Sequence, residues 1–122
     1  MTLVKVCTVA DVPEGEVRRF VIDHRPIAVS NLGEQGFRAV DAICSHAHYF
    51  LDEGELDVED ETVECPKHGS TFDLNTGQPT TLPATLPVEV FAVKTEGDDV
   101  LIELTELTEL TELTKMTEVT DD

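Results

Sequence analysis

The residues with the clearest chemistry are two short pairs that each combine a cysteine with a histidine. Cys44 and His46 form a C-x-H pair, Cys65 and His68 form a C-x-x-H pair, and 18 residues separate the two. Both pairs follow short apolar runs with the character of β-strands, whose ends can hold two loops rigidly side by side. Thiolates suit iron–sulfur clusters and zinc, and imidazoles suit zinc and iron. The four side chains therefore predict a metal centre.

Two kinds of centre use such a mixed set of two cysteines and two histidines. In a Rieske centre, two cysteines bind one iron of a [2Fe–2S] cluster and two histidines bind the other. A structural zinc site uses the same side chains around one tetrahedral ion, usually with cysteine paired to cysteine and histidine to histidine. Here each pair joins a cysteine to a histidine in a strand-rich context. This favours the diiron cluster, with a zinc-stabilised adaptor as the alternative.

The stretch CSH…CPKHGSTFDLNTGQ resembles the two cluster-binding loops of Rieske-type ferredoxins, the small electron carriers of bacterial multicomponent oxygenase systems. The similarity runs from about Leu3 to Glu103. It implies an all-β antiparallel fold of three sheets, with a two-loop subdomain at one end that binds one [2Fe–2S] cluster. It also implies that Cys44 and Cys65 lie deep, while His46 and His68 lie at the exposed tip and bind through Nδ1.

Two departures separate this chain from the Rieske proteins of respiratory complexes, which resemble C-T-H-x-x-C and C-x-C-H. The extra cysteines of those motifs form a disulfide across the two loops. Tyr49 and Lys67 stand at these places here, so no such disulfide is expected. The remaining cysteine, Cys7, is interpreted as a small buried strand residue.

Hydrogen bonds to the cluster sulfurs help to set the reduction potential, which spans about −150 to +300 mV in Rieske centres. The respiratory proteins carry a hydroxyl two residues after the second histidine and a tyrosine four residues after it. This chain keeps the first as Ser70 and has Phe72 at the second place. The resemblance therefore implies a potential in the lower part of that range, raised somewhat by Ser70.

Residues near the ligands have simpler interpretations. Gly69 lets the second loop pass close to the cluster, and Pro66 stiffens the turn before it. The run Leu82–Pro87 resembles the proline-bearing segment that covers the cluster and excludes water in this family. His48 is not expected to be a ligand, because four ligands already complete the centre, and His24 is expected in a loop.

The elements that must position these residues are short strands separated by turn residues, typical of an antiparallel sandwich or barrel. No convincing helical period occurs before residue 103, and the acidic segment Leu51–Glu61 is expected to be a loop with a brief turn or strand. Hairpins are expected at Gly33–Gly36, Asn75–Gly77 and Gly97–Asp99. The expected strands are Leu3–Cys7, Val17–Asp23, Pro26–Leu32, Phe37–Ala42, Thr62–Cys65, Ser70–Leu74, Gln78–Leu82, Val88–Thr95 and Val100–Glu103.

The C-terminal segment differs from the rest of the chain. From Glu103 the triplet Glu-Leu-Thr repeats and then decays. A period of three matches neither a strand nor an α-helix, so the leucines would give no stable apolar face. We expect a Rieske domain over residues 1–103 and an acidic low-complexity tail over 104–122 that continues the last strand and carries no chemistry. A short packed helix is the alternative for the tail.

The net charge is −18, of which the last 19 residues contribute −5, so the first 103 residues carry −13. Such a field repels nucleic acid and anionic lipid and attracts basic protein surfaces, although it also serves solubility. Residues 1–11 do not have the composition of a secretory signal, and no 18 consecutive apolar residues occur. We therefore expect a cytoplasmic protein without nucleic-acid or membrane partners, in which cysteines serve metal or redox chemistry rather than disulfides.

Three functions are compatible with these features. The first is a one-electron carrier between a flavin-dependent ferredoxin reductase and a terminal non-haem iron oxygenase. The second is a related Rieske ferredoxin that supplies electrons to, or accompanies, the sulfur-mobilisation proteins of iron–sulfur assembly. The third is the zinc adaptor. The chain has no glycine-rich motif for nucleotide binding, and it is too short to contain an oxygenase catalytic domain as well. No residue is needed as nucleophile or general base, so it is not expected to be an enzyme by itself.

The partner surface is expected around His46 and His68. Tyr49 and Phe50 are its expected apolar contacts. The acidic residues Asp52, Glu53 and Glu55 are expected to meet basic residues of the reductase.

Overall fold

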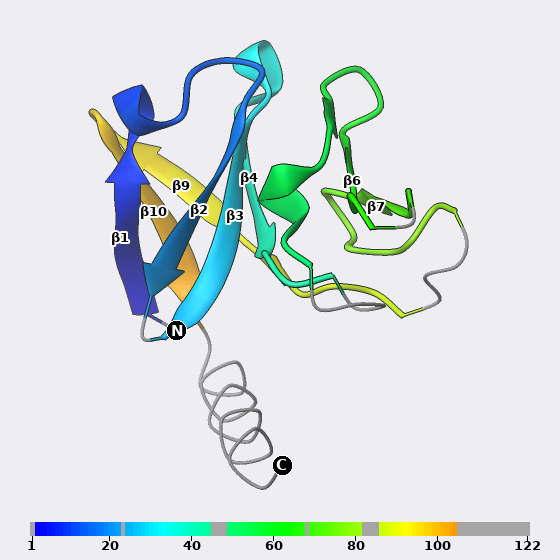
Figure 1. The fold of residues 1–122 in the computed structure, drawn as a ribbon. Coiled ribbons are helices and arrows are strands. Elements are labelled where there is room, and N and C mark those ends of the chain that lie inside the picture. The colour runs from blue at the N-terminus through cyan, green and yellow to red at the C-terminus, as the bar shows by residue number, and fades with distance from the viewer. Residues whose placement is uncertain (1, 23, 45–48, 68, 82–85, 105–122) are drawn as a thin grey trace, which may run out of the picture.

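The computed structural model describes residues 2–22, 24–44, 49–67, 69–81 and 86–104, whose strands form three antiparallel sheets (Figure 1). The sheets have the strand orders β1-β10-β9, β2-β3-β4-β8 and β5-β6-β7. The strands are β1 (Thr2–Thr8), β2 (Val17–Ile22), β3 (Arg25–Asn31), β4 (Phe37–Asp41), β5 (Leu56–Asp57), β6 (Thr62–Glu64), β7 (Thr71–Asp73), β8 (Val90–Phe91), β9 (Val93–Glu96) and β10 (Asp99–Leu104). The three-sheet antiparallel fold is thus confirmed.

Helical structure within the described residues is limited to three short 3₁₀ turns, η1 (Val9–Asp11), η2 (Gly33–Gln35) and η3 (Leu51–Glu53). Accordingly, none of the described helices has the length or the apolar character to cross a membrane. The turn η3 and the two-residue strand β5 both fall in the acidic segment 51–61, where a brief turn or strand was expected.

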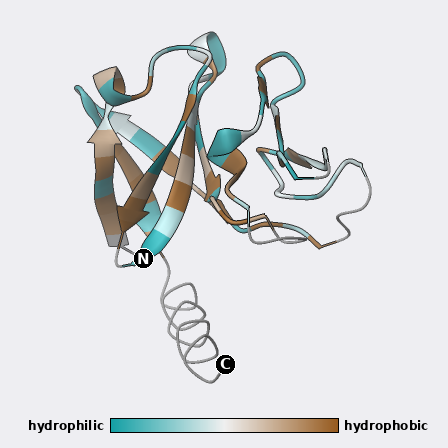
Figure 2. Ribbon diagram, viewed as in Figure 1, coloured by the Kyte–Doolittle hydropathy of each residue, from teal (hydrophilic) through white to brown (hydrophobic). Residues whose placement is uncertain are grey.

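The sheet β2-β3-β4-β8 lies between the other two and shares a core with each of them. Side chains alternate across its strands, so that Ile27 and Val29 of β3 face one core while Ala28 faces the other. Because both faces of β3 are buried, this strand carries a continuous hydrophobic stretch rather than an alternation of hydrophobic and hydrophilic residues (Figure 2).

The first core fills the space between this sheet and β1-β10-β9. Val100, Ile102 and Leu104 of β10 are buried there, and β10 pairs with β1 from Thr2↔Leu104 to Thr8↔Asp99 with a register shift between Lys5 and Cys7. Cys7 is part of this core and is nearly fully buried, which confirms its interpretation as a buried strand residue.

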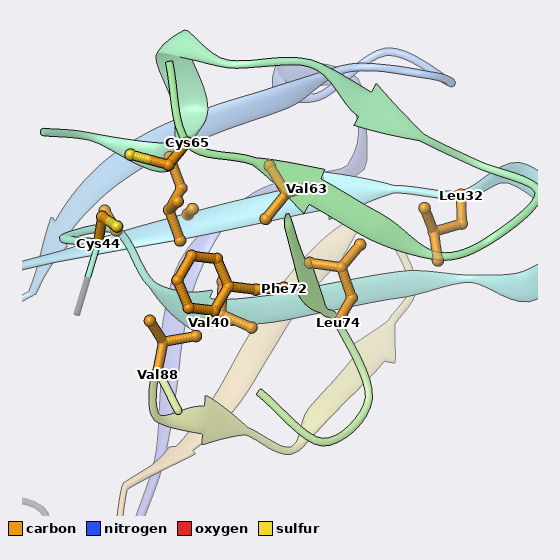
Figure 3. Close-up of a cluster of buried hydrophobic side chains, with 11 residues drawn as sticks. Leu32, Val40, Cys44, Val63, Cys65, Phe72, Leu74 and Val88 are labelled. Carbon is orange, nitrogen blue, oxygen red and sulfur yellow. The ribbon is translucent and has the colours of Figure 1, made fainter. Parts of the chain in front are cut away.

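The second core joins the central sheet to β5-β6-β7 and contains two of the predicted ligands. Figure 3 shows Cys44 and Cys65 at the end of this cluster opposite Leu32, with Phe72 between. The buried members are Ala28, Leu32, Val40, Ala42, Cys44, Leu51, Val63, Cys65, Phe72, Leu74 and Val88.

Arg38 of β4 connects the central sheet to the small sheet by polar contacts. Its Nη2 donates to Glu61 Oε1 at 3.0 Å, and its Nε donates to Asn75 Oδ1 at 2.8 Å. The Glu61 carbonyl accepts from Leu74 N at 2.8 Å, and Glu61 itself adopts a φ of 55°. These contacts fix the turns at the base of the β6–β7 hairpin against the central sheet.

Two predicted strands differ from the structure. Residues Gln78–Leu82 were expected as a strand, but residues 78–81 make only an isolated bridge, Phe72↔Pro79, and Leu82 lies outside the described residues. Asp73 N still donates to Gln78 O and Thr80 N to Thr71 O. Pro79 has no backbone N–H, so it cannot donate the next hydrogen bond of a strand pairing with β7.

The segment Val88–Thr95 was expected as one strand, and the structure divides it. Residues Val90–Phe91 pair with β4 in the central sheet, while Val93–Glu96 pair with β10 in the outer sheet. The chain passes between the sheets at the exposed Ala92. An apolar alternation does not reveal such a change of sheet, because both halves keep the two-residue period.

Gly54 generates a prediction about the support of the second cysteine loop. A Cβ at this position would lie 1.6 Å from the backbone oxygen of Glu64 and 3.3 Å from Pro66 Cδ. Its φ of −93° suits any residue, so the obstacle is contact alone. We expect Gly54→Ala to push η3 away from the end of β6 and to destabilise the protein by about 1–3 kcal/mol, measured by thermal unfolding together with iron content.

Gly15→Ala is the matched control. Gly15 has a φ of +82° but open space for a Cβ, so its substitution costs about 1–2 kcal/mol of backbone strain at a site away from the cysteines. We expect it to lower stability without lowering the iron content. Equal iron content in the two purified variants would show that the Gly54 contact does not support the metal centre.

Candidate metal centre

The first cysteine loop leaves the end of β4 and returns toward η3. Cys44 N donates to Tyr49 O at 2.9 Å, and residues Ile43 and Phe50 form an antiparallel bridge just outside this bond. Leu51 N then donates to Ala42 O at 2.7 Å. The two arms of the loop are therefore held together like a short hairpin, and Cys44 is 3% exposed at its root.

The second cysteine loop connects β6 to β7 and closes in the same way. Cys65 N donates to Ser70 O at 2.7 Å, and Gly69 N donates back to Cys65 O at 3.0 Å. Gly69 has a φ of +76°, a conformation that L-residues with a side chain rarely adopt. The glycine is thus required by the tight return, and Cys65 is 1% exposed.

The two cysteine loops are closed by the same backbone hydrogen-bond pattern. In each, the cysteine amide is bonded to the carbonyl of the residue five positions later, Tyr49 for Cys44 and Ser70 for Cys65. Both thiols enter the same buried cluster, as the resemblance implied for the deep ligands. Two loops with equivalent closure therefore bring one thiol each to one place.

The predicted histidine ligands His46 and His68 lie outside the described residues, as does His48. Within the described ranges no group of three or more His, Cys, Asp or Glu side chains is placed to hold a metal ion. The structure thus brings together Cys44 and Cys65, and the assignment of the two histidines stays a prediction.

The donor chemistry of the described residues fits an iron–sulfur cluster. All three cysteines are free, so the two buried thiols of the loops are not joined to each other or to Cys7. A thiolate needs compensation when it is moved into an apolar environment, and coordination to iron supplies it. Burial and the nearby Asp11 carboxylate raise the pKa of Cys7 to about 11, which keeps this third thiol protonated near neutral pH.

A contact across the two loops occupies the positions where the respiratory proteins have their disulfide. Lys67 Nζ lies 5.2 Å from the centroid of the Tyr49 ring. Such a cation–π contact at an exposed site contributes about 0.5–1 kcal/mol. In place of a covalent link, a weak reversible contact joins these two positions.

Arg19 of β2 holds the returning arm of the first loop. Its Cζ lies 3.7 Å from the centroid of the Phe50 ring, and its Nε lies 3.9 Å from Asp52 Oδ1. Burial raises the pKa of the Asp52 carboxyl, although the Arg19 charge acts in the opposite direction. Sequence analysis missed Arg19, because nothing in the local pattern indicates a contact over thirty residues away.

This contact changes the predicted partner surface. Phe50 and Asp52 turn inward against Arg19, and the Asp52 side chain is only 13% exposed. Tyr49, Glu53 and Glu55 are exposed. The latter three residues therefore remain available to a partner, whereas Phe50 and Asp52 serve the loop itself.

Comparison with known proteins identifies the family. A family model described as "Rieske [2Fe-2S] domain" matches residues 2–92. The chain belongs to the Rieske [2Fe–2S] family. Its cofactor is therefore one Rieske-type [2Fe–2S] cluster, and one-electron transfer rather than substrate turnover is its activity.

Individual relatives place the chain among Rieske ferredoxins. The ferredoxin component of biphenyl 2,3-dioxygenase from Rhodococcus jostii (strain RHA1) is 45% identical over 104 residues, 85% of this chain and 94% of that protein. The solved ferredoxin of carbazole 1,9a-dioxygenase from Nocardioides aromaticivorans IC177 is 33% identical with a TM-score of 0.80 and covers 86% of this chain and 100% of its own.

A second solved structure is a complex of reduced oxygenase and oxidised ferredoxin in carbazole 1,9a-dioxygenase. It is 36% identical with a TM-score of 0.73, and the match covers 82% of this chain and 100% of that chain. In that system the ferredoxin and the oxygenase are therefore found together.

The surroundings of the second loop generate a prediction about the potential. Ser70 is fully buried beside Cys65, and Phe72 is fully buried without a hydroxyl. We expect Ser70→Ala to lower the reduction potential, because a hydroxyl near the cluster stabilises the more negative reduced state. Direct voltammetry of both proteins measures the potential. A wild-type potential near the top of the Rieske range would contradict the expected value in the lower part of that range.

Proposed function

We propose that this chain is the ferredoxin component of a bacterial multicomponent oxygenase system. It takes single electrons from a flavin-dependent ferredoxin reductase and passes them to a terminal non-haem iron oxygenase. The observation that carries the proposal is the 45% identity over 94% of a dioxygenase ferredoxin component. The complex of oxygenase and ferredoxin in the carbazole system supports the choice of acceptor.

The proposed ligands are Cys44 and Cys65 for one iron and His46 and His68 for the other. The equivalent closure of the two loops and the burial of both thiols support this assignment. When bound, the cluster accepts and releases one electron. The chain's own residues fix the thiols, exclude water around them and, at Tyr49, Glu53 and Glu55, offer a surface to the partner.

The location and the domain division follow from the same proposal. A carrier that meets a reductase and an oxygenase in solution belongs in the cytoplasm, and the free cysteines agree with a reducing compartment. Strand β10 ends at Leu104, and residues 105–122 lie outside the described residues. We keep the proposal that the acidic repeat there carries no chemistry.

The ligand assignment predicts a sharp division among variants. Cys44→Ser, Cys65→Ser, His46→Ala and His68→Ala should each lose the brown colour and most of the iron, since each removes one of four ligands. Cys7→Ser and His48→Ala are the matched controls and should keep both, because Cys7 lies in the other core. Visible absorption and metal analysis measure this, and a colourless wild-type protein that holds zinc would favour the adaptor instead.

The oxygenase proposal predicts salt-dependent reduction. Stopped-flow reduction of the holoprotein by the reductase of a dioxygenase system should slow as ionic strength rises, because screening weakens the attraction of an acidic carrier to a basic surface. Replacing Glu53 and Glu55 by glutamine should reduce both the rate at low salt and its salt dependence. Replacing the exposed Glu96 and Asp98, which lie on the sheet β1-β10-β9 and its turn, should change neither.

Two results would count against this proposal. A reduction rate of the wild-type protein that does not depend on salt would contradict the proposed electrostatic contact with the reductase. Failure to reduce any terminal oxygenase, combined with reduction of sulfur-mobilisation proteins, would favour the iron–sulfur assembly alternative.

A further inference from the structure

Arg25 is a buried cation near the root of the first cysteine loop. It opens β3, directly after His24 with its φ of 68°, and its side chain is 4% exposed. Its Nη2 donates to Glu89 Oε1 at 2.7 Å and to Asp41 Oδ2 at 3.3 Å, and its Cζ lies 4.9 Å from the Phe91 ring centroid. The Arg25 guanidinium therefore connects β3 to the end of β4 and to the start of β8.

Asp41 stands at the root of the first cysteine loop, and Glu89 comes shortly after the segment that was expected to cover the cluster. Asp41 is the last residue of β4, three residues before Cys44, and its Oδ1 accepts from Ile43 N at 3.1 Å. The backbone N of Asp41 donates to Glu89 O at 2.9 Å. Glu89 follows the proline-bearing segment 82–87 and directly precedes β8.

The Asp41 carboxylate thus connects the cation to the loop. One oxygen bonds Arg25, and the other bonds the amide of the residue that directly precedes Cys44. If the guanidinium is lost, the carboxylate can rotate or take up water, and the bond to Ile43 N loses its fixed geometry. The placement of the cysteine therefore depends on Arg25 through one intermediate side chain.

Stability alone does not account for a buried group of this kind. Desolvating two or three charges costs several kcal/mol per ion, and well-packed apolar residues often replace buried ion pairs at no loss of stability. Nη1 of Arg25 finds no hydrogen-bond partner among the residues described. A positional role explains the buried Arg25 better, because its planar guanidinium makes directional hydrogen bonds to two carboxylates.

We propose that Arg25 is a positioning residue that, through Asp41 and Glu89, fixes the root of the Cys44 loop against the segment leading out of residues 82–87. The proposal rests on the ligand assignment of the proposed function. It makes Arg25 responsible for the rigidity of one ligand loop and for neutralising carboxylate charge near the cluster, since unneutralised Asp41 and Glu89 would disfavour the more negative reduced state.

The test compares the holoprotein with Arg25→Gln, Arg25→Lys and the control Arg18→Gln. Arg18 lies on the neighbouring strand β2 and forms an exposed ion pair with Glu16, so its loss changes the same charge without touching the loop. Glu89→Gln is a milder second variant, because it keeps an oxygen acceptor and removes only the charge. The readouts are amide hydrogen exchange, the reduction potential and the EPR spectrum of the reduced protein.

We expect Arg25→Gln to speed amide hydrogen exchange about tenfold or more in peptides covering 41–44 and 86–91. This factor corresponds to the loss of one charge-assisted hydrogen bond. Exchange in β1 and β10 should not change. The potential should fall and the EPR lines should broaden, since the loop samples more positions. Arg25→Lys should keep most of the potential but show faster exchange, and Arg18→Gln should match wild type in every readout.

The proposal is overturned if Arg25→Gln and Glu89→Gln melt at lower temperature but match Arg18→Gln in local exchange, potential and EPR spectrum. If Arg25→Gln does not fold, Glu89→Gln decides between the same two results. A wild-type protein without an iron–sulfur signal would instead contradict the proposed function, while the exchange data would still report on the link between Arg25 and the loop.

Discussion

Two thiols buried at one end of an apolar cluster are the constraint on which the rest of this structure depends. Cys44 and Cys65 arrive from strands of different sheets and from positions 21 residues apart in the chain. Each is fixed at the root of a loop by a hydrogen bond from its own amide to the residue five positions later. Apolar burial excludes water around the sulfurs, so metal coordination and nearby dipoles act there with little screening.

The central sheet makes this arrangement possible because it takes part in both cores. One face packs on β1-β10-β9 and the other on the cysteine cluster. Three arginines of this sheet make its contacts with the neighbouring segments: Arg19 with the returning arm of the first loop, Arg25 with the root of that loop, and Arg38 with the turns at the end of the β6–β7 hairpin far from Cys65. In a chain of net charge −18 with eight basic residues, these cations are placed where acidic segments must be held close together.

Much of the fold and the cysteine half of the site follows from local sequence patterns. The segment Leu3–Cys7 alternates with a two-residue period and Val17–Asp23 follows a Pro-Glu-Gly turn, and the structure has β1 and β2 at these places. The Cys–His spacing predicted the metal centre, and the family match agrees with a Rieske cluster. Other features depend on contacts between distant residues. The change of sheet at Ala92 and the inward turn of Asp52 toward Arg19 leave no local signal.

The ligation of the cluster is tested most directly by pulsed EPR of the reduced protein labelled with ¹⁵N-histidine. The account predicts couplings to two histidine nitrogens, of which one is lost in His46→Ala and the other in His68→Ala in any cluster that these variants retain. A reduced iron–sulfur signal with no histidine nitrogen coupling, or a protein that contains zinc and no such signal, would contradict it.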